Sequence, residues 1–163
     1  MEKLKQDVLI LLKEDARYSV GKLATMLGAK EGDVKNAVLD LENDGVIVKY
    51  SVLVNEAKIG DDLVEALIEV KVTPKAGRGF DAIAEEVCAF DEVKSVYLMS
   101  GAYDLAVNVI GKNLKDVAMF VSEKLSTMDE VLSTATHFIL KKYKVDGVMF
   151  EDGDPTGRMA VQP

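Results

Sequence analysis

The order of two apolar patterns between residues 63 and 140 constrains the fold of this chain more than any other feature. The run "LVEALIEVKV" largely alternates apolar and polar side chains, which predicts a half-buried strand. A helix-spaced pattern begins near Gly79, two β-branched runs flank the break "SGAYD", and Asn113 begins a second helix-spaced pattern. The alternating run "LSTATHFILKKY" closes the series. This β-α-β-β-α-β order is typical of a ferredoxin-like, split-βαβ arrangement.

The residues before this unit predict short helices followed by an extended run. Apolar residues in "KLKQDVLILLKE" recur at helical spacing, and Ser19 is a good N-cap for a second helix that Gly28 ends. A third helix ends near Gly45, and the β-rich run Val46–Asn55 follows. Because only a few residues around Gly28 join the second and third helices, the spacing is typical of a helix-turn-helix. The strand after it resembles a wing or linker.

These patterns predict an α+β chain with two domains. We expect residues 1–54 to form a winged helix-turn-helix domain with its linker strand, and residues 55–150 to form the ferredoxin-like domain. Residues 151–163 are a polar, turn-rich tail. Helices would cover one face of the predicted sheet, while the other face would expose apolar side chains such as Leu63 and Leu67. An exposed apolar face of this kind predicts a homodimer.

Composition excludes several classes of function. The 163-residue chain carries a formal net charge of −8, so a general attraction to nucleic acid or to anionic lipid is not expected. With one cysteine and one histidine, the chain has no disulfide and no metal-ligand cluster, and we predict no cofactor. Cys88 lies in an apolar helical pattern and is expected in the core. The apolar run Val8–Leu12 is too short to span a membrane, and the cysteine usage fits a reducing cytoplasm.

The break between the two central strands contains two residues that need an explanation. Gly101 fits a tight turn, which requires backbone angles that other residues avoid. Asp104 places a carboxylate at the start of a run that is otherwise apolar. Two explanations stand side by side for this carboxylate. It either hydrogen-bonds amides of the turn, or it faces a bound ligand.

The order and spacing of these pieces resemble the Lrp/AsnC family, the leucine-responsive and asparagine-operon regulators. The resemblance extends from about Gln6 to Phe150, and it is carried by "DVLILLKEDARYSVGKLATMLGAKEGDVKNAVLDLENDGVI", "YSVLVNEAKIG", "GAYDL" and "STATHFIL". It implies a DNA-binding dimer that assembles further into a tetramer or octamer. It also implies that the second domain binds a small effector, often an amino acid, in a cleft between neighbouring dimers.

The resemblance assigns the effector site to the break and to the last strand. The family's glycine and aspartate that line the cleft match Gly101 and Asp104. Asp104 would accept the ammonium of a free amino acid, and backbone N–H groups of the turn would bind its carboxylate. As β-branched residues, the two threonines of the last strand also fit a strand without any ligand. The expected effector residues are Ser100, Gly101, Ala102, Tyr103 and Asp104, together with Thr134 and Thr136, which match the family's threonines.

The third helix would enter the major groove of DNA, as the resemblance implies, yet its composition departs from the family. Lys30 stands where a Ser or Thr cap is expected, and Ala37 stands where the family usually has an arginine. Residues 1–60 carry nine Lys and Arg against ten Asp and Glu, although phosphate contacts supply most non-specific affinity for DNA. The expected DNA contacts are Lys35 and Asn36 for base edges, and Arg17, Lys22, Lys30 and Lys49 for the backbone.

Three functional hypotheses follow from these observations. The first is a transcription regulator that binds double-stranded DNA and whose affinity a small effector modulates. The second is an effector-binding modulator that mixes with related subunits and has lost DNA binding, which the acidic third helix favours.

The third hypothesis is an enzyme similar to the decarboxylases of sirohaem derivatives, which share the two-domain design. An acidic tetrapyrrole needs cationic groups, and the chain offers only His137, Arg17, Arg78 and Arg158 as histidine or arginine. The sequence also shows no nucleophile–base pair and no phosphate-binding loop, so we expect no enzyme and no catalytic residue.

Overall fold

The structure is a computed structural model that describes residues 3–60, 63–74, 77 and 79–150. The chain divides into two compact units, residues 1–54 and 55–163, and each unit has an apolar core of its own. The tail predicted for residues 151–163 lies outside the described residues.

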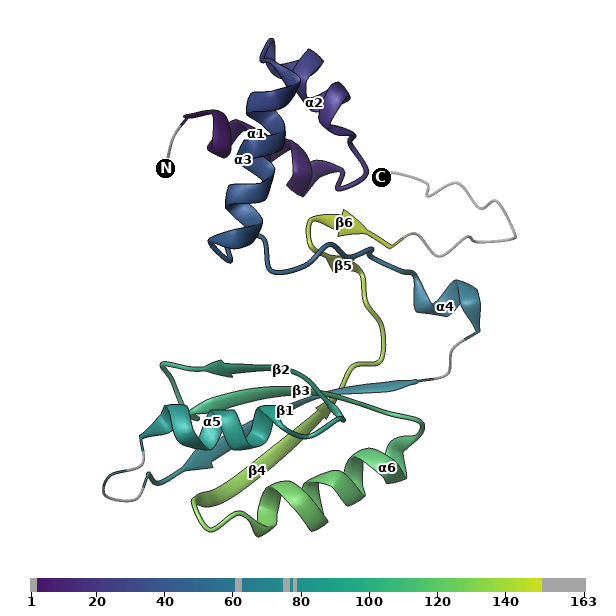
Figure 1. The fold of residues 1–163 in the computed structure, drawn as a ribbon. Coiled ribbons are helices and arrows are strands. Elements are labelled where there is room, and N and C mark those ends of the chain that lie inside the picture. Colours follow the sequence, from purple (N-terminus) through teal and green to yellow (C-terminus); the bar gives the residue numbers. More distant parts are fainter. Residues whose placement is uncertain (1–2, 61–62, 75–76, 78, 151–163) are drawn as a thin grey trace, which may run out of the picture. The chain divides into compact units, whose positions relative to one another are not determined.

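The first unit is a helix-turn-helix built around a small apolar core (Figure 1). Its helices are α1 (Lys3–Glu14), α2 (Val20–Leu27) and α3 (Glu31–Asn43). Ser19 caps the N-terminus of α2, because its Oγ accepts a hydrogen bond from the Lys22 N–H at 3.2 Å. Gly28 caps the C-terminus with a φ of 62°, in the left-handed region that favours glycine. These helices and this turn confirm the prediction. The core side chains are Val8, Leu12, Leu23, Ala24, Val34, Ala37 and Leu41.

The run after α3 is not the strand that the sequence predicts. Residues 46–55 form no strand in the described part of the chain. Every second side chain of this run is apolar and at least 42% exposed, namely Val46, Val48, Tyr50, Val52 and Val54. This alternation fits a β-strand, but a strand needs a neighbour that hydrogen-bonds its backbone. Residues 46 and 47 are bends, residues 48–55 have no regular secondary structure, and the described residues of the chain supply no pairing strand.

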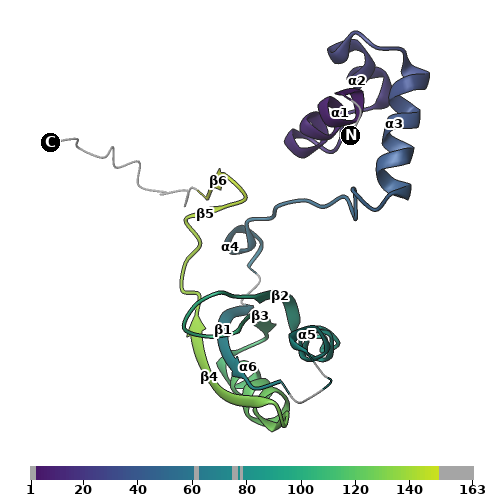
Figure 2. The same ribbon diagram turned by 90° about the vertical axis from the view of Figure 1, so that its left-hand side faces the viewer.

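The second unit is an antiparallel sheet with helices between its strands (Figure 2). Its elements are α4 (Glu56–Ile59), β1 (Val64–Val72), α5 (Phe80–Cys88), β2 (Val93–Leu98), β3 (Leu105–Gly111), α6 (Leu114–Met119), β4 (Val131–Phe138), β5 (Lys144–Val145) and β6 (Val148–Met149). The main sheet has the strand order β2-β3-β1-β4, which is the ferredoxin-like order that the sequence predicts. α6 continues as a π-helical segment, Phe120–Lys124, and then as a 3-10 turn, Leu125–Thr127.

One face of the main sheet carries the core of the second unit. Ala66, Ile68 and Val70 alternate along β1 and are fully buried, as the period of two predicts. They belong to the same apolar cluster as Ile83 of α5 and Val117 of α6, because both helices cover this face (Figures 1 and 2).

The opposite face of the sheet is more polar than the sequence analysis expects. Leu63 is 41% exposed and Leu67 is half-buried, in agreement with the prediction of apolar side chains there. Glu65 and Glu69 share this face of β1, and Asn108 of β3 stands opposite Leu67. The expectation of an apolar face is therefore only partly met, since charged residues surround the leucines.

Gly111 ends β3 where the backbone approaches α6 closely. A Cβ atom on Gly111 would lie 2.9 Å from Cγ2 of Val117 and 3.3 Å from the carbonyl oxygen of Asn113. We expect Gly111→Ala to lower the free energy of unfolding by about 1–3 kcal/mol, because the added methyl group must displace Val117. Urea denaturation followed by circular dichroism measures the change. Gly101→Ala is the matched control, because a Cβ atom on Gly101 meets nothing within 4 Å. Equal losses of stability in the two variants would contradict this account.

Candidate effector site and nucleic-acid interface

The connection between β2 and β3, Met99–Asp104, is longer than the tight turn that the sequence predicts. It is closed by one backbone hydrogen bond, in which the Met99 N–H donates to the Asp104 carbonyl oxygen at 2.8 Å. The φ of Gly101 lies outside the left-handed region, and a Cβ atom there would meet no neighbour within 4 Å. The predicted conformational reason for Gly101 is therefore wrong, because a longer connection reverses the chain without a positive φ.

The carboxylate of Asp104 extends the hydrogen-bond ladder between β3 and β1. The Asp104 N–H donates to the Val70 carbonyl oxygen at 3.0 Å, and the carboxylate Oδ2 accepts the Val72 N–H at 2.9 Å. The carboxylate therefore pairs with a strand amide rather than with the turn amides that the sequence analysis considers. The side chain is half-buried, and its Oδ1 has no hydrogen-bond partner among the described residues. That oxygen is the one that a cationic group can reach.

The predicted effector residues fall into two groups within one chain. Ser100, Gly101 and Ala102 are exposed beside Asp104, and Tyr103 is half-buried. The two predicted threonines lie on β4, on the far side of β1 from β3. Two strand spacings amount to roughly 10 Å.

The same register places the two threonines on the helix-covered face of the sheet. Thr134 stands opposite Val70, and Thr136 stands opposite Ile68. Both β1 residues are buried in the core, and directly paired residues in an antiparallel ladder point to the same face. The fold of one chain therefore assembles the turn but does not bring the threonines to it.

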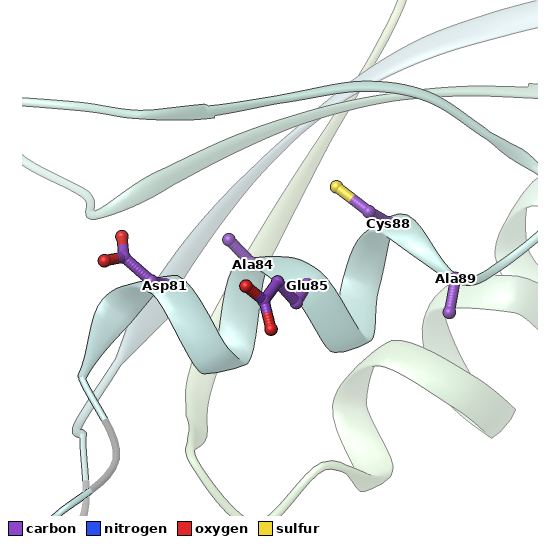
Figure 3. Close-up of a pocket in the computed structure, with 5 residues that line it drawn as sticks. All are labelled: Asp81, Ala84, Glu85, Cys88 and Ala89. Carbon is purple, nitrogen blue, oxygen red and sulfur yellow. The ribbon is translucent and has the colours of Figure 1, made fainter.

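A shallow hollow of about 530 Å³ lies elsewhere, on α5 (Figure 3). Its lining comes from α5 and the residue after it, so no second element offers a converging group. Cys88 is exposed there, which contradicts the prediction that it lies in the core. Val87 takes the core position, and the next residue of a helix points about 100° away. The lining residues are Asp81, Ala84, Glu85, Cys88 and Ala89.

The predicted DNA-contact residues of α2, the turn and α3 are all exposed. Lys22 lies with its Nζ 4.4 Å from the centre of the Tyr18 ring, a cation–π contact that leaves the ammonium at the surface. Lys30 occupies the N-cap position of α3 with extended backbone and no side-chain cap, as the sequence predicts. Lys35 and Asn36 lie on the solvent side of α3. Lys49 is exposed in the run after α3.

Arg17 forms a surface ion pair with Asp15, and its side chain is 88% exposed. Nε and Nη2 donate to the two carboxylate oxygens at 3.1 and 3.0 Å, and the Arg17 N–H donates to Asp15 as well. The side-chain hydrogen bond from Arg17 is the main reason that the pKa of Asp15 lies below its usual value near 3.8. A DNA phosphate would have to compete with this carboxylate for Arg17.

Ala37 is a core residue rather than a DNA-facing one. It is 4% exposed and packs with Val34 and Leu41, so it lies on the inner face of α3 and not on the face that the sequence analysis assigns to DNA. An arginine at this position would meet the core of the unit rather than the groove. The helical period decides this, because residues 34, 37 and 41 share the inner face of α3.

The acidic residues in the second half of α3 have partners that sequence reasoning missed. The Lys5 ammonium lies 2.7 Å from the Asp40 carboxylate, and the Tyr50 hydroxyl donates to Glu42 at 2.8 Å. Neither contact has a local signal in the sequence, because both join residues from different segments. Glu31 is one of the acidic residues in the first turn of α3, and it is exposed.

Within the described residues, no group of three or more His, Cys, Asp or Glu side chains is arranged to hold a metal ion. The helices in that part of the chain are all too short or too polar to cross a membrane.

Comparison with known proteins identifies both units. Residues 65–149 match the Lrp/AsnC ligand binding domain, and residues 1–48 match a winged helix-turn-helix DNA-binding domain. The chain is 50% identical to the HTH-type transcriptional regulator YugG of Bacillus subtilis over 158 residues, which is 96% of this chain and 95% of that relative. It is 31% identical to the HTH-type transcriptional regulator LrpA of Pyrococcus abyssi over 84% of this chain and 94% of the relative.

A solved structure shares the fold at lower identity. The transcriptional regulator NMB0573 of Neisseria meningitidis, crystallised as a complex with L-Met, matches with a TM-score of 0.73 and 20% identity over 89% of this chain and 93% of that one. The two matched domains together span nearly the whole chain, and a relative shares half of its residues. The chain therefore belongs to the Lrp/AsnC family of helix-turn-helix transcriptional regulators.

Proposed function

We propose that this regulator binds an amino acid at the turn between β2 and β3 and that the bound amino acid changes its affinity for DNA. The observation that carries the proposal is the turn itself. Among the described residues, Gly101 has no conformational or packing requirement, and Asp104 keeps one oxygen without a partner. A glycine with open space above it suits the close approach of a ligand or a neighbouring backbone.

The chemistry of a free amino acid matches this turn. Its ammonium pairs with Oδ1 of Asp104 while Oδ2 stays on the Val72 N–H. Its carboxylate takes backbone N–H groups from Ser100, Gly101 and Ala102, which are exposed. A fold relative crystallised with L-Met supports the same class of ligand.

The site needs more than one copy of the chain. Thr134 and Thr136 lie two strands from Asp104 on the helix-covered face, so any role for them in the site requires a neighbouring subunit. We infer a homodimer that assembles into a tetramer or octamer. The half-buried Leu67 and the 58% exposed Tyr97 on the open sheet face support contact between copies.

The first unit would bind double-stranded DNA in the cytoplasm through α3. Lys35 and Asn36 are the candidates for base edges, and Lys22, Lys30 and Lys49 for phosphates. Arg17 contributes least, because Asp15 already binds its guanidinium.

The first test replaces Asp104 by Asn, which keeps an oxygen for the Val72 N–H but removes the negative charge. We expect Asp104→Asn to bind its amino acid about 10- to 150-fold more weakly, because a hydrogen bond to a charged group contributes about 1.5–3 kcal/mol. Isothermal titration calorimetry with each of the twenty amino acids measures the affinity. Asp91→Asn, at an exposed position, is the control. Unchanged affinity in Asp104→Asn would exclude the carboxylate as the ammonium acceptor.

The second test adds a methyl group at the turn. Gly101→Ala should fold with ordinary stability, because its φ is compatible with alanine and the space above it is open within the chain. We expect the same variant to lose amino-acid binding at least tenfold, because the methyl group occupies the space of the ligand. Calorimetry reports the binding and urea denaturation reports the stability. Tight binding by a stable Gly101→Ala variant would contradict the proposed site.

The third test concerns the DNA interface. We expect Lys35→Ala to weaken binding to DNA from upstream of the regulator's own gene by about 1–3 kcal/mol if Lys35 reaches a base edge. Arg17→Ala should cost less, since it breaks a pair with Asp15 at the same time. Fluorescence anisotropy at two salt concentrations measures both, with the exposed Lys13→Ala on α1 as control. An intact oligomer that binds no DNA even at low salt would instead favour a modulator that mixes with related subunits.

A further inference from the structure

A row of side chains with alternating charges crosses one end of the main sheet. This end lies opposite the turn between β2 and β3. The Lys142 ammonium pairs with Glu65 of β1 and lies 2.9 Å from Oε2 of Glu56 on α4. The other oxygen of Glu56 lies 3.7 Å from the ammonium of Lys94 on β2. Asn108 of β3 donates from Nδ2 to Oε1 of Glu65 at 2.7 Å. We call these side chains, Glu56, Glu65, Lys94, Asn108 and Lys142, the anchor cluster.

The anchor cluster is partly withdrawn from water and is charge-balanced. The side chain of Glu65 is 13% exposed, and that of Lys142 is 30% exposed. Burial by itself would raise the pKa of Glu65, but hydrogen bonds from Lys142 and Asn108 bring it below its usual value. Burial would likewise lower the pKa of Lys142, and its two carboxylate partners raise it instead. Glu65 and Lys142 therefore stabilise each other's charged form.

The cluster holds two segments that apolar packing does not hold. Ile59 of α4 is 64% exposed, and Leu140 in the segment after β4 is 94% exposed. Neither residue belongs to the core of the second unit. The segment after β4 starts with a backbone hydrogen bond, from the Ile139 N–H to the Glu65 carbonyl oxygen at 2.9 Å, and Lys142 then reaches back to Glu56. Charge pairing therefore fixes α4 and this segment to the sheet.

The anchor cluster also lies where the linker enters the ligand-binding unit. α4 is the first element after the run 46–54, which links the DNA-binding unit to the ligand-binding unit. The strands that carry Glu65 and Asn108 are the same two strands that meet Asp104 at their other end. From Glu65 to Val72, β1 spans roughly 23 Å at the rise of a strand. The paired strands β1 and β3 thus run from the turn to the point where the linker attaches, and the pairing of β1 with β4 shifts register between Lys71 and Val72.

We propose that the anchor cluster fixes where the linker leaves the ligand-binding unit and is thereby the positioning contact that transmits the effector response to the DNA-binding unit. The second part rests on the proposed function, because it presupposes an effector at the turn. The first part does not, since α4 and Lys142 meet in the chain as it stands.

Hydrogen exchange tests the first part directly. We expect Lys142→Met to speed amide exchange in residues 55–60 and 139–145 at least tenfold, while β1 and β3 keep their protection. Glu56→Gln, which leaves the pair between Lys142 and Glu65 intact, should speed exchange in residues 55–60 alone. Lys142→Arg should restore protection because it keeps the charge. Lys144→Met, at an exposed lysine of β5, is the matched control. Unchanged exchange in both Lys142→Met and Glu56→Gln would overturn the proposal.

Electron–electron double resonance tests the departure of the linker. Nitroxide labels on the exposed Cys88 and on a Lys13→Cys substitution report distances between the two units, with labelled chains diluted in unlabelled Cys88→Ser chains. We expect a broader distance distribution in Lys142→Met and Glu56→Gln than in Lys144→Met. Identical distributions in all three would show that the anchor cluster does not direct the linker, and would overturn the proposal.

Anisotropy titrations test the transmission. Labelled upstream DNA is titrated with each variant, with and without L-methionine as the probe. We expect Lys142→Met and Glu56→Gln to bind L-methionine and DNA separately within twofold of the unchanged protein, while the effect of L-methionine on DNA affinity falls at least fivefold. Full coupling in both variants would overturn the transmitting role. If L-methionine does not change the DNA affinity of the unchanged protein, L-methionine is excluded as the effector. The hydrogen-exchange and double-resonance measurements still test whether the anchor cluster holds the linker.

Discussion

The central position of β1 determines what the rest of the ligand-binding unit can do. Because β3 and β4 pair with β1 on its two sides, the backbone hydrogen-bonding groups of β1 have partners. The side chains of β1 then decide what packs on each face of the sheet. Ile68 and its inward neighbours bury one face under the helices, while Glu65 stands on the other. The same register offers the Val72 N–H to Asp104 at one end of the strand and Glu65 to Lys142 at the other. One strand therefore positions both the proposed effector turn and the anchor cluster.

Apolar periodicity predicted the order of helices and strands because one buried face suffices to produce it, as in β1 and α5. Apolar periodicity failed where strand formation or burial depends on features beyond the local pattern. The run 46–54 alternates like a strand but has no pairing strand among the described residues. Cys88 follows a core position and points outward, and Ala37 takes a core position at which a family comparison expects a functional arginine. Residue type alone does not distinguish these cases; the angle around the helix does.

Contacts made by charged side chains of the first unit are also invisible to a count of charges. A count of acidic and basic residues treats each charge as available, whereas Asp40 and Glu42 on α3 have contacts with Lys5 and Tyr50. Arg17 also pairs with Asp15, while its side chain stays 88% exposed. Each of these ion pairs joins one positive and one negative charge and leaves the net charge unchanged, and exposed pairs are weak enough to rearrange. The contacts of Asp40 and Glu42 join different segments, so the sequence does not display them, whereas Asp15 and Arg17 are two residues apart.

A charge-paired attachment has a different consequence from an apolar one. Burial of apolar surface is non-directional, so an apolar α4 would tolerate several positions against the sheet. Lys142, held between the carboxylates of Glu56 and Glu65, specifies one geometry, yet its net contribution is modest because water competes for partly exposed charges. A ligand can shift an equilibrium only by its difference in affinity between two states. The attachment through Lys142 is specific in direction but modest in free energy. A single small effector can therefore shift its equilibrium, whereas it cannot shift that of a fully packed junction.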